Sequence, residues 1–294
     1  MRLERIISLA NVTVRHRFLA MERSLRAVGC DLPLDVIPYD DRRFDLPPNS
    51  SWLEDAEFFA FLAREGARPV SRKYLCLTRS NYQFVDADVV FLRDPREVLA
   101  PVEGFVISCV HWRDPHHVLT PELEAMLRRR TTVWRQWLFN SGQFACDRAL
   151  YSVTSLQAAL LEPASLTTAL QNPYHEQPGM NWLVLRTGVA VTSLMLQPHL
   201  MESTWAGDYP GDYLSYWKNP RTRPYLIHWA GLGNREDRPI DRLYLEFLTQ
   251  EEQRQWREQR DTRHRRSRRL GTRMRGWAVR FRKGLRAFAK AWSE

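Results

Sequence analysis

The stretch that decides the fold is Phe84-Val85-Asp86-Ala87-Asp88-Val89-Val90-Phe91, in which two carboxylates interrupt an apolar run of residues that favour β-strands. A strand of this composition is usually buried on both faces, and burying ionised carboxylates costs several kcal/mol unless another group compensates. We therefore expect the strand to end here, with both carboxylates at its C-terminal edge. Open α/β sheets bind their ligands at that edge.

The spacing of the two aspartates also favours a cation site. Side chains alternate along a strand, so Asp86 and Asp88 are expected to point to the same side and to converge on one hard cation. A divalent cation held in this way can bind a diphosphate. The alternative is a solvated acidic turn, because Asp-x-Asp is a common tripeptide.

Length and composition indicate a globular protein. With 294 residues, 44% of them hydrophobic, the chain can build one large α/β domain or two modest ones. The cysteines include no Cys-x-x-Cys pair, so we expect reduced, buried thiols at Cys30, Cys76, Cys109 and Cys146. The apolar run near the N-terminus is too short for a signal peptide, and no apolar stretch reaches 18 residues, so we expect a cytoplasmic protein that does not span a membrane.

The net charge of +9 belongs to the end of the sequence. Residues 254–294 carry fifteen Lys or Arg and three acids, which leaves residues 1–253 mildly acidic. Such charge asymmetry indicates a separate interaction segment. We therefore divide the chain into a folded domain at 1–250 and a basic tail at 251–294.

Strand and helix patterns alternate through the first domain. The order β-α-β-α-β predicts a mostly parallel sheet with helical crossovers. We expect helices at 15–28, 54–65, 70–77 and 151–161. We expect strands at 5–10, 34–39, 104–110, 137–145, 188–195 and 224–229, in addition to the one that ends within 84–91.

Four segments occur in an informative order between residues 5 and 235: the acidic stretch Phe84–Val90, then Phe139–Phe144 (FNSGQF), Glu176–Asn181 (EQPGMN) and Ile227–Gly231 (IHWAG). Together they resemble the GT-A nucleotide-sugar glycosyltransferases, above all the retaining glycogenin and lipopolysaccharide-galactosyltransferase type. The resemblance implies a single α/β, Rossmann-like GT-A domain with a mostly parallel mixed sheet flanked by helices. A C-terminal basic amphipathic helix is expected to follow it.

The first and fourth segments imply a metal site. They are similar to the family's metal-binding Asp-x-Asp and to the start of its His-x-x-Gly-x-x-Lys motif, which makes Asp86, Asp88 and His228 the expected ligands. Two carboxylates and one imidazole suit Mn²⁺ or Mg²⁺, which acts as a Lewis acid on a leaving diphosphate. The alternative for His228 is a structural histidine at a strand end.

The resemblance also implies residues that bind the substrate. The second segment is similar to one that lines the donor sugar, although Asn-Ser-Gly is more often an ordinary turn. Lys73 or Arg72 stands at roughly the place of a family basic residue, but we favour a charge on a surface helix there. The family lysine would fall at Asn234, so Arg235 is its expected substitute, as a guanidinium fork suits phosphate. The remaining expected substrate contacts are Leu9, Ala10, Asn11, Tyr39 and Asp40 for base and ribose, with Ala87, Asn140, Ser141, Gly142 and Gly231 nearer the sugar and phosphates.

The third segment implies the catalytic pair. It is similar to the family's Asp-Gln-Asp or Asp-Gln-Pro-x-x-Asn element near the reacting centre, which corresponds to Glu176 and Gln177. Gln177 cannot ionise and is expected to hydrogen-bond donor or acceptor, while Glu176 positions the acceptor or stabilises positive charge. The alternative is a helix start, where acids are favoured in the first turn.

The basic tail has the pattern of an interfacial membrane helix. From Leu270 to Trp292, nine apolar residues fall on one helical face, and Arg and Lys occupy the rest. We expect residues 270–292 to bind an anionic membrane surface and place the protein peripherally on the inner face of the membrane. The alternatives are docking on the protein's own core or on a partner and, less favoured, binding of nucleic acid.

These observations predict a cytoplasmic, metal-dependent glycosyltransferase that moves a sugar, with retention, from a nucleotide diphosphate donor (UDP is expected) to a glycan or glycolipid acceptor. One alternative is a nucleotidyltransferase, but such enzymes usually open with a Gly-rich phosphate loop, and Ser8–Thr13 contains no glycine. The other is an inactive GT-A-like protein whose tail binds membrane or nucleic acid.

Overall fold

The computed structural model describes residues 1–171, 176–232 and 236–262. The chain divides into two compact units, Met1–Phe247 and Leu248–Glu294. In the second unit residues 250–262 are helical, and the apolar stripe expected at 270–292 lies outside the described residues. Among the described residues, none of the helices combines the length and apolar character that a membrane span requires.

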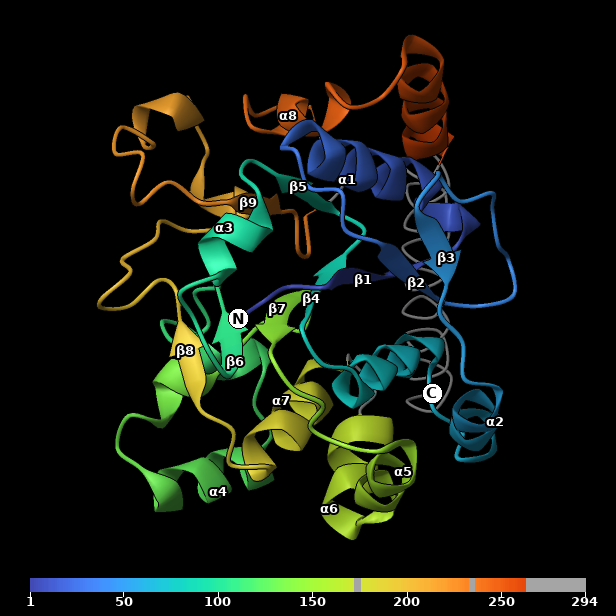
Figure 1. The fold of residues 1–294 in the computed structure, drawn as a ribbon, viewed down its shortest axis with the longest axis vertical. Coiled ribbons are helices and arrows are strands. Elements are labelled where there is room, and N and C mark those ends of the chain that lie inside the picture. The colour runs from blue at the N-terminus through green and yellow to red at the C-terminus, as the bar shows by residue number, and fades with distance from the viewer. Residues whose placement is uncertain (172–175, 233–235, 263–294) are drawn as a thin grey trace, which may run out of the picture. The chain divides into compact units, whose positions relative to one another are not determined.

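The first unit is built on a seven-stranded sheet with the order β3-β2-β1-β4-β7-β6-β8 (Figure 1). All neighbouring strands are parallel except β7, which is antiparallel to both β4 and β6. The mostly parallel mixed sheet is therefore confirmed. The strands are β1 (Arg5–Ala10), β2 (Leu34–Pro38), β3 (Ser50–Trp52), β4 (Tyr82–Asp86), β6 (Phe105–Ile107), β7 (Gln143–Cys146) and β8 (Val191–Ser193).

Helices cover both faces of this sheet, as alternation along β1 shows. Ile7 and Leu9 lie in one hydrophobic cluster with residues of α2, α5 and α7, whereas Ile6 and Ala10 lie in another with residues of α1 and α3. Figure 1 shows α1 on one side of the sheet and α2, α5 and α7 on the other. The helices are α1 (Arg15–Ala27), α2 (Ala56–Arg64), α3 (Pro95–Leu99), α4 (Pro121–Arg130), α5 (Val153–Leu161), α6 (Pro163–Ser165), α7 (Gln177–Arg186) and α8 (Asp241–Leu245).

The acidic stretch is where the chain leaves the main sheet. β4 ends at Asp86, as expected, and Ala87 and Asp88 form a turn into β5 (Val89–Phe91). β5 pairs with β9 (Leu226–His228) in a separate antiparallel sheet, which we call the β5–β9 ribbon. The two carboxylates converge, as predicted, but the turn and not strand alternation brings them together, because Asp88 lies outside the strand.

Several other boundaries differ from the sequence prediction. The expected strand at 137–145 is only β7, preceded by a 3₁₀ helix at Trp134–Trp137. The expected helix at 70–77 is the longer 3₁₀ helix η2 (Pro69–Thr78). Helix α4 and strand β3 were not predicted, and in β3 the residues Ser50–Trp52 are only half-buried or exposed. The weak apolar signal of an edge strand explains that omission.

All four cysteines are free and buried, as the sequence predicts. Burial raises the pKa of each thiol, in the case of Cys146 to about 11. The thiols are therefore protonated near neutral pH.

Gly179 marks a tight contact in the core. A Cβ at this position in the first turn of α7 would collide with Ala169 and with the Tyr74 hydroxyl. Alanine is the better helix former by about 1 kcal/mol, but overpacking a core costs about 1–3 kcal/mol. Because the new methyl would lie 2.4 Å from the backbone Cα of Ala169, the cost is expected at the upper end of that range. We therefore expect Gly179→Ala to destabilise the fold by about 2 kcal/mol, measured by urea unfolding. Gly211→Ala, with open space around the new methyl, is the control; equal stabilities of the two variants would contradict this packing.

Candidate functional site

A cavity opens at the C-terminal edge of the sheet. β1 is parallel to both β2 and β4, with Leu9 opposite Ile37 on one side and Asp86 on the other, so the residues that follow these strands emerge together. The cavity has a volume of about 460 Å³, within the range of small-molecule sites. Its walls are Leu9, Ala10, Asn11, Thr13, Val14, Arg17, Tyr39, Arg42, Val70, Lys73, Asp86, Ala87, Asp88 and Glu176.

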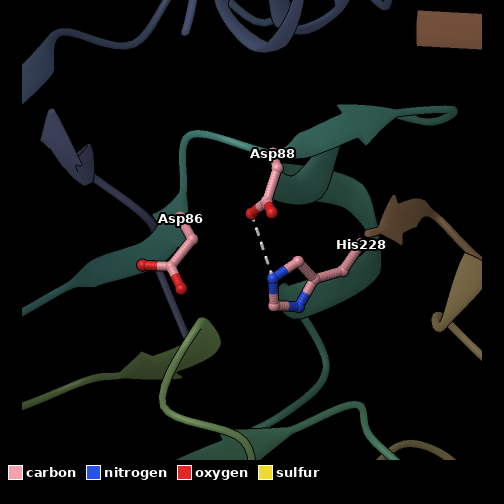
Figure 2. Close-up of side chains that lie close together, drawn as sticks. All are labelled: Asp86, Asp88 and His228. Atoms are coloured by element: carbon pink, nitrogen blue, oxygen red, sulfur yellow. Dashed lines mark ion pairs between the residues drawn. The ribbon is translucent and has the colours of Figure 1, made fainter. Parts of the chain in front are cut away.

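Asp86, Asp88 and His228 form one cluster beside this cavity. Each offers a ligand atom, and these atoms lie within 4.8 Å of one another. The His228 Nε2 atom is 3.3 Å from Asp88 Oδ1. Figure 2 shows the three side chains converging from different segments: the end of β4, the turn after it and β9.

The β5–β9 ribbon is what brings His228 to the two aspartates. Val89 of β5 lies opposite His228 of β9, and the Trp229 amide donates a hydrogen bond to the Asp88 carbonyl over 3.0 Å. The His228 amide donates to the Thr204 carbonyl over 2.7 Å. Backbone pairing thus holds His228 next to Asp88, although the two are 140 positions apart in the sequence.

Gly142 leaves room for the cluster. Its carbonyl accepts a hydrogen bond from the Asp86 amide over 2.8 Å, and a Cβ on it would collide with the His228 ring and lie 2.5 Å from Asp86 Oδ2. The Asn140 Oδ1 atom accepts from the Gly142 amide over 2.7 Å. The Asn-Ser-Gly segment is therefore a turn that also shapes the site, because no side chain fits at position 142.

Lys73 is buried, so the prediction of a surface charge was wrong. Its side chain is 1% exposed, and its Nζ atom lies 3.1 Å from Asp86 Oδ1 and 2.7 Å from Glu176 Oε1. The Ser141 hydroxyl donates to the same Glu176 oxygen over 2.8 Å. Lys73 thus ties the end of β4 to Glu176, the residue before α7.

The charges of the cluster follow from burial and these partners. Burial raises the pKa of Asp86, although Lys73 and His228 oppose it. For Glu176 burial also acts upward, but the Lys73 ammonium outweighs it and lowers the pKa to about 2. Burial would likewise lower the pKa of Lys73, yet Asp86 and Glu176 raise it. At neutral pH, Lys73 and Glu176 are therefore an ionised pair.

Arg17 and His111 were missed by the sequence analysis. The Arg17 Nη1 atom lies 2.9 Å from Asp88 Oδ2, and this pair lowers the pKa of Asp88 together with His228, against the effect of burial. Burial lowers the pKa of His111 to about 4, and its Nε2 atom is 3.4 Å from Asn140 Nδ2. The sequence near Arg17 or His111 carries no pattern that predicts these contacts. Arg17 lies in α1 and His111 after β6, and only the tertiary fold brings these segments to the cluster.

The structure gathers most of the expected substrate residues. Leu9, Ala10, Asn11, Tyr39 and Ala87 line the cavity. The side-chain Nδ2 atom of Asn11 donates a hydrogen bond to Asp40 Oδ2 over 2.9 Å. Gln177, Asn140, Ser141, Gly142, His228 and Gly231 are not part of the cavity wall. The Gln177 Oε1 atom is buried and accepts no hydrogen bond from the part of the chain described. Arg235 and Asn234 lie outside the described residues.

Comparison with known proteins identifies the fold. No family model matches the chain, and no curated protein matches its sequence. The crystal structure of the galactosyltransferase LgtC in complex with donor and acceptor sugar analogs matches with a TM-score of 0.50 and 12% identity, over 84% of this chain and 98% of that one. The bifunctional glycosyltransferase WbbM matches with a TM-score of 0.51 and 13% identity, over 85% of this chain and 50% of that one. The expected GT-A-like glycosyltransferase fold is therefore confirmed.

The buried Lys73–Glu176 pair can be tested by a double-mutant cycle. We expect Lys73→Met to cost about 3 kcal/mol, because it leaves the largely buried Glu176 and the half-buried Asp86 without their cation. Glu176→Gln is expected to lower the stability less, because Lys73 still has Asp86 as an ion-pair partner. The double variant should be less destabilised than the sum of the two by more than about 1 kcal/mol, measured by urea unfolding. Additive effects would show that the pair contributes no net attraction.

Proposed function

We propose that this protein is a metal-dependent glycosyltransferase that moves a sugar from a nucleotide diphosphate donor, preferably a UDP-sugar, to a glycan or glycolipid acceptor. The observation that carries the proposal is the Asp86–Asp88–His228 cluster beside the 460 Å³ cavity. It lies at the sheet edge where α/β proteins bind ligands, in a fold shared with LgtC and WbbM, both glycosyltransferases by description.

The cluster fits a divalent cation. Hard cations bind oxygen ligands at about 2.0–2.6 Å, so atoms that share one ion lie within about 5 Å of each other. The 4.8 Å limit for Asp86, Asp88 and His228 satisfies this condition, and the absence of a side chain at Gly142 leaves space. Two oxygens and one nitrogen suit Mn²⁺ or Mg²⁺. When bound, such a cation would stabilise the negative charge of the leaving diphosphate.

The cavity wall supplies contacts for the donor. Tyr39 offers an aromatic face to the base, and the Asn11 side-chain amide, which also donates to Asp40 outside the wall, offers a polar contact for base or ribose. Arg17 carries a guanidinium into the cavity beside Asp88, where it can bind a phosphate oxygen. These groups divide the wall into a part suited to a nucleoside and a part suited to a diphosphate.

Glu176 and Gln177 are proposed to act on the sugar. Glu176 lines the cavity, and its low pKa keeps it ionised, so it can stabilise positive charge that develops on the sugar ring. Lys73 and Ser141 hold its carboxylate in place. The Gln177 Oε1 atom, which accepts no hydrogen bond from the described residues, can accept one from a sugar hydroxyl. We propose net retention at the anomeric carbon, in line with the resemblance to retaining enzymes.

Metal-dependent UDP binding tests the proposed site. By calorimetry, we expect UDP to bind in the presence of Mn²⁺ or Mg²⁺ and at least tenfold more weakly in EDTA. Asp88→Asn removes one ligand charge and should reduce the metal-dependent affinity by about tenfold or more. Gly142→Ala should do the same by filling the space between Asp86 and His228.

Asp45→Asn is the matched control, because it makes the same charge change at an exposed aspartate outside the cavity wall. The proposed metal site would be contradicted if UDP bound equally well with and without the metal, or if the Asp45 and Asp88 variants had equal affinities for UDP. Transfer itself is measured with a panel of UDP- and GDP-sugars, and NMR of the anomeric proton reports retention. Glu176→Gln should then lower the turnover rate more than the UDP affinity.

A second proposal concerns the tail, and it rests on the sequence pattern alone. We propose that residues 270–292 bind an anionic membrane surface, because the spacing of their apolar residues and their many Arg and Lys are typical of an interfacial helix. We expect the full chain to float with vesicles containing phosphatidylserine, and to be released by about 0.5 M salt.

In the full chain, Trp277→Ser with Phe281→Ser keeps the net charge and should lower vesicle binding by at least tenfold, since insertion of the apolar face is lost. Trp112→Ser with Phe59→Ser provides a control for the loss of aromatic residues elsewhere. If the Trp277→Ser, Phe281→Ser variant floats as well as the unchanged chain, charge attraction alone explains the binding, and the proposal of an inserted helix is wrong.

A further inference from the structure

A second cavity lies at the opposite end of the β5–β9 ribbon from the Asp86–Asp88–His228 cluster. Asp88 precedes β5 and His228 ends β9, whereas Arg93 follows β5 and Arg223 precedes β9. Four residues, three of them in β5, separate Asp88 from Arg93, a span of at most about 17 Å. The second cavity has a volume of about 210 Å³ and is lined by Arg93, Glu97, Val98, Leu194, His199, Met201 and Arg221.

Backbone hydrogen bonds fix the walls of this cavity. The Arg93 amide donates to the Tyr225 carbonyl over 3.2 Å, and the Met201 amide donates to the Leu194 carbonyl over 2.8 Å. The Glu202 amide donates to the Thr222 carbonyl over 2.7 Å. Three chain segments that carry the lining residues are thus held against one another, so the cavity is part of the fold and not a gap between loose loops.

The cavity gathers more positive than negative charge among the described residues: Arg93 and Arg221 line it, with Glu97 as the acid in its wall. Within the described ranges, neither Arg93 nor Arg221 makes an ion pair, and the buried Arg93 Nε atom has no hydrogen-bond partner. Arg223 stands near enough to repel Arg93, and it also has a buried Nε atom without a partner. A buried donor without an acceptor costs about 1–3 kcal/mol, so Arg93, which lines the cavity, favours a ligand with acceptor oxygens. Arg223 is not a lining residue and contributes only its positive charge beside the cavity.

The acids nearby are too few to neutralise these cations. Glu97 lines the cavity and acts on Arg93 from the same segment, while Glu202 accepts a hydrogen bond from the Thr222 hydroxyl. Arg223 packs over the Trp217 ring, which orients its side chain without supplying an oxygen. His199 also lines the cavity, and an imidazole N–H can donate a further hydrogen bond.

We propose that this cavity binds a phosphoryl group, either as free inorganic phosphate or as the ester of a small sugar phosphate. Guanidinium groups bind phosphate through paired hydrogen bonds, and the tetrahedral oxygens of a phosphoryl group can accept from Arg93 and Arg221 at the same time. The volume is below the range of about 300–1,000 Å³ for drug-sized ligands, so a small anion fits better than a nucleotide. The inference does not depend on the proposed glycosyl transfer.

The test uses the full chain with inorganic phosphate and glucose 6-phosphate as probes, in calorimetry and thermal unfolding at constant ionic strength. We expect saturable binding of at least one probe, with a rise in Tm that chloride does not produce. Arg93→Gln and Arg221→Gln should each weaken it by about tenfold or more, since a charge-assisted hydrogen bond is lost. If Arg93→Gln does not fold, the exposed Arg221→Gln decides alone.

Arg129→Gln, with the same charge change on the exposed face of α4, is the matched control and should bind the probe normally. Tighter binding of the sugar phosphate identifies the ester as the ligand, and equal binding identifies free phosphate. Binding of neither probe, or binding unchanged in the Arg221 variant, would overturn the proposal. Metal-dependent UDP binding, measured in the same variants, should remain unchanged, so a failure at one cavity is distinguished from a failure at the other.

Discussion

Lys73 places a positive charge inside the core, where it contacts Asp86 at the end of β4 and Glu176 before α7. A buried ammonium is tolerated only when opposite charges surround it, and the largely buried Glu176 and half-buried Asp86 carboxylates are stabilised by a cation in return. The three charges therefore require one another. This mutual requirement fixes the distance between the sheet edge and α7, and with it the inner wall of the larger cavity.

The chain builds the remainder of the site by leaving its main sheet. Continuation of β4 through residue 88 would have buried both aspartates between helices, whereas the turn at Ala87 and Asp88 starts the β5–β9 ribbon instead. The ribbon then brings in His228 by backbone pairing. One short departure from regular structure thus positions a carboxylate and an imidazole that are far apart in sequence.

Local patterns predicted the parts of the fold that depend on local physics. β1, β2 and α1 were predicted closely, because apolar, β-branched runs and helical spacing determine them. The Asp86–Asp88–His228 cluster was predicted from motif order, although the geometric reason offered for the two aspartates was wrong. Lys73, Arg17 and Arg93 could not be assigned their environments, because each depends on segments that meet only in three dimensions. An arginine or lysine in sequence gives no sign of whether its charge is solvated or enclosed.

The buried cysteines have a practical consequence. Thiol reagents attack the thiolate and need access to it, and all four sulfurs are enclosed and protonated in the native fold. Alkylation should therefore proceed only through openings of the structure, so the labelling rate of each position reports how often its surroundings separate. Cys76 in η2 and Cys146 in β7 lie on one side of the sheet and Cys30, after α1, on the other. The molecule thus carries natural probes of local opening on both of its faces.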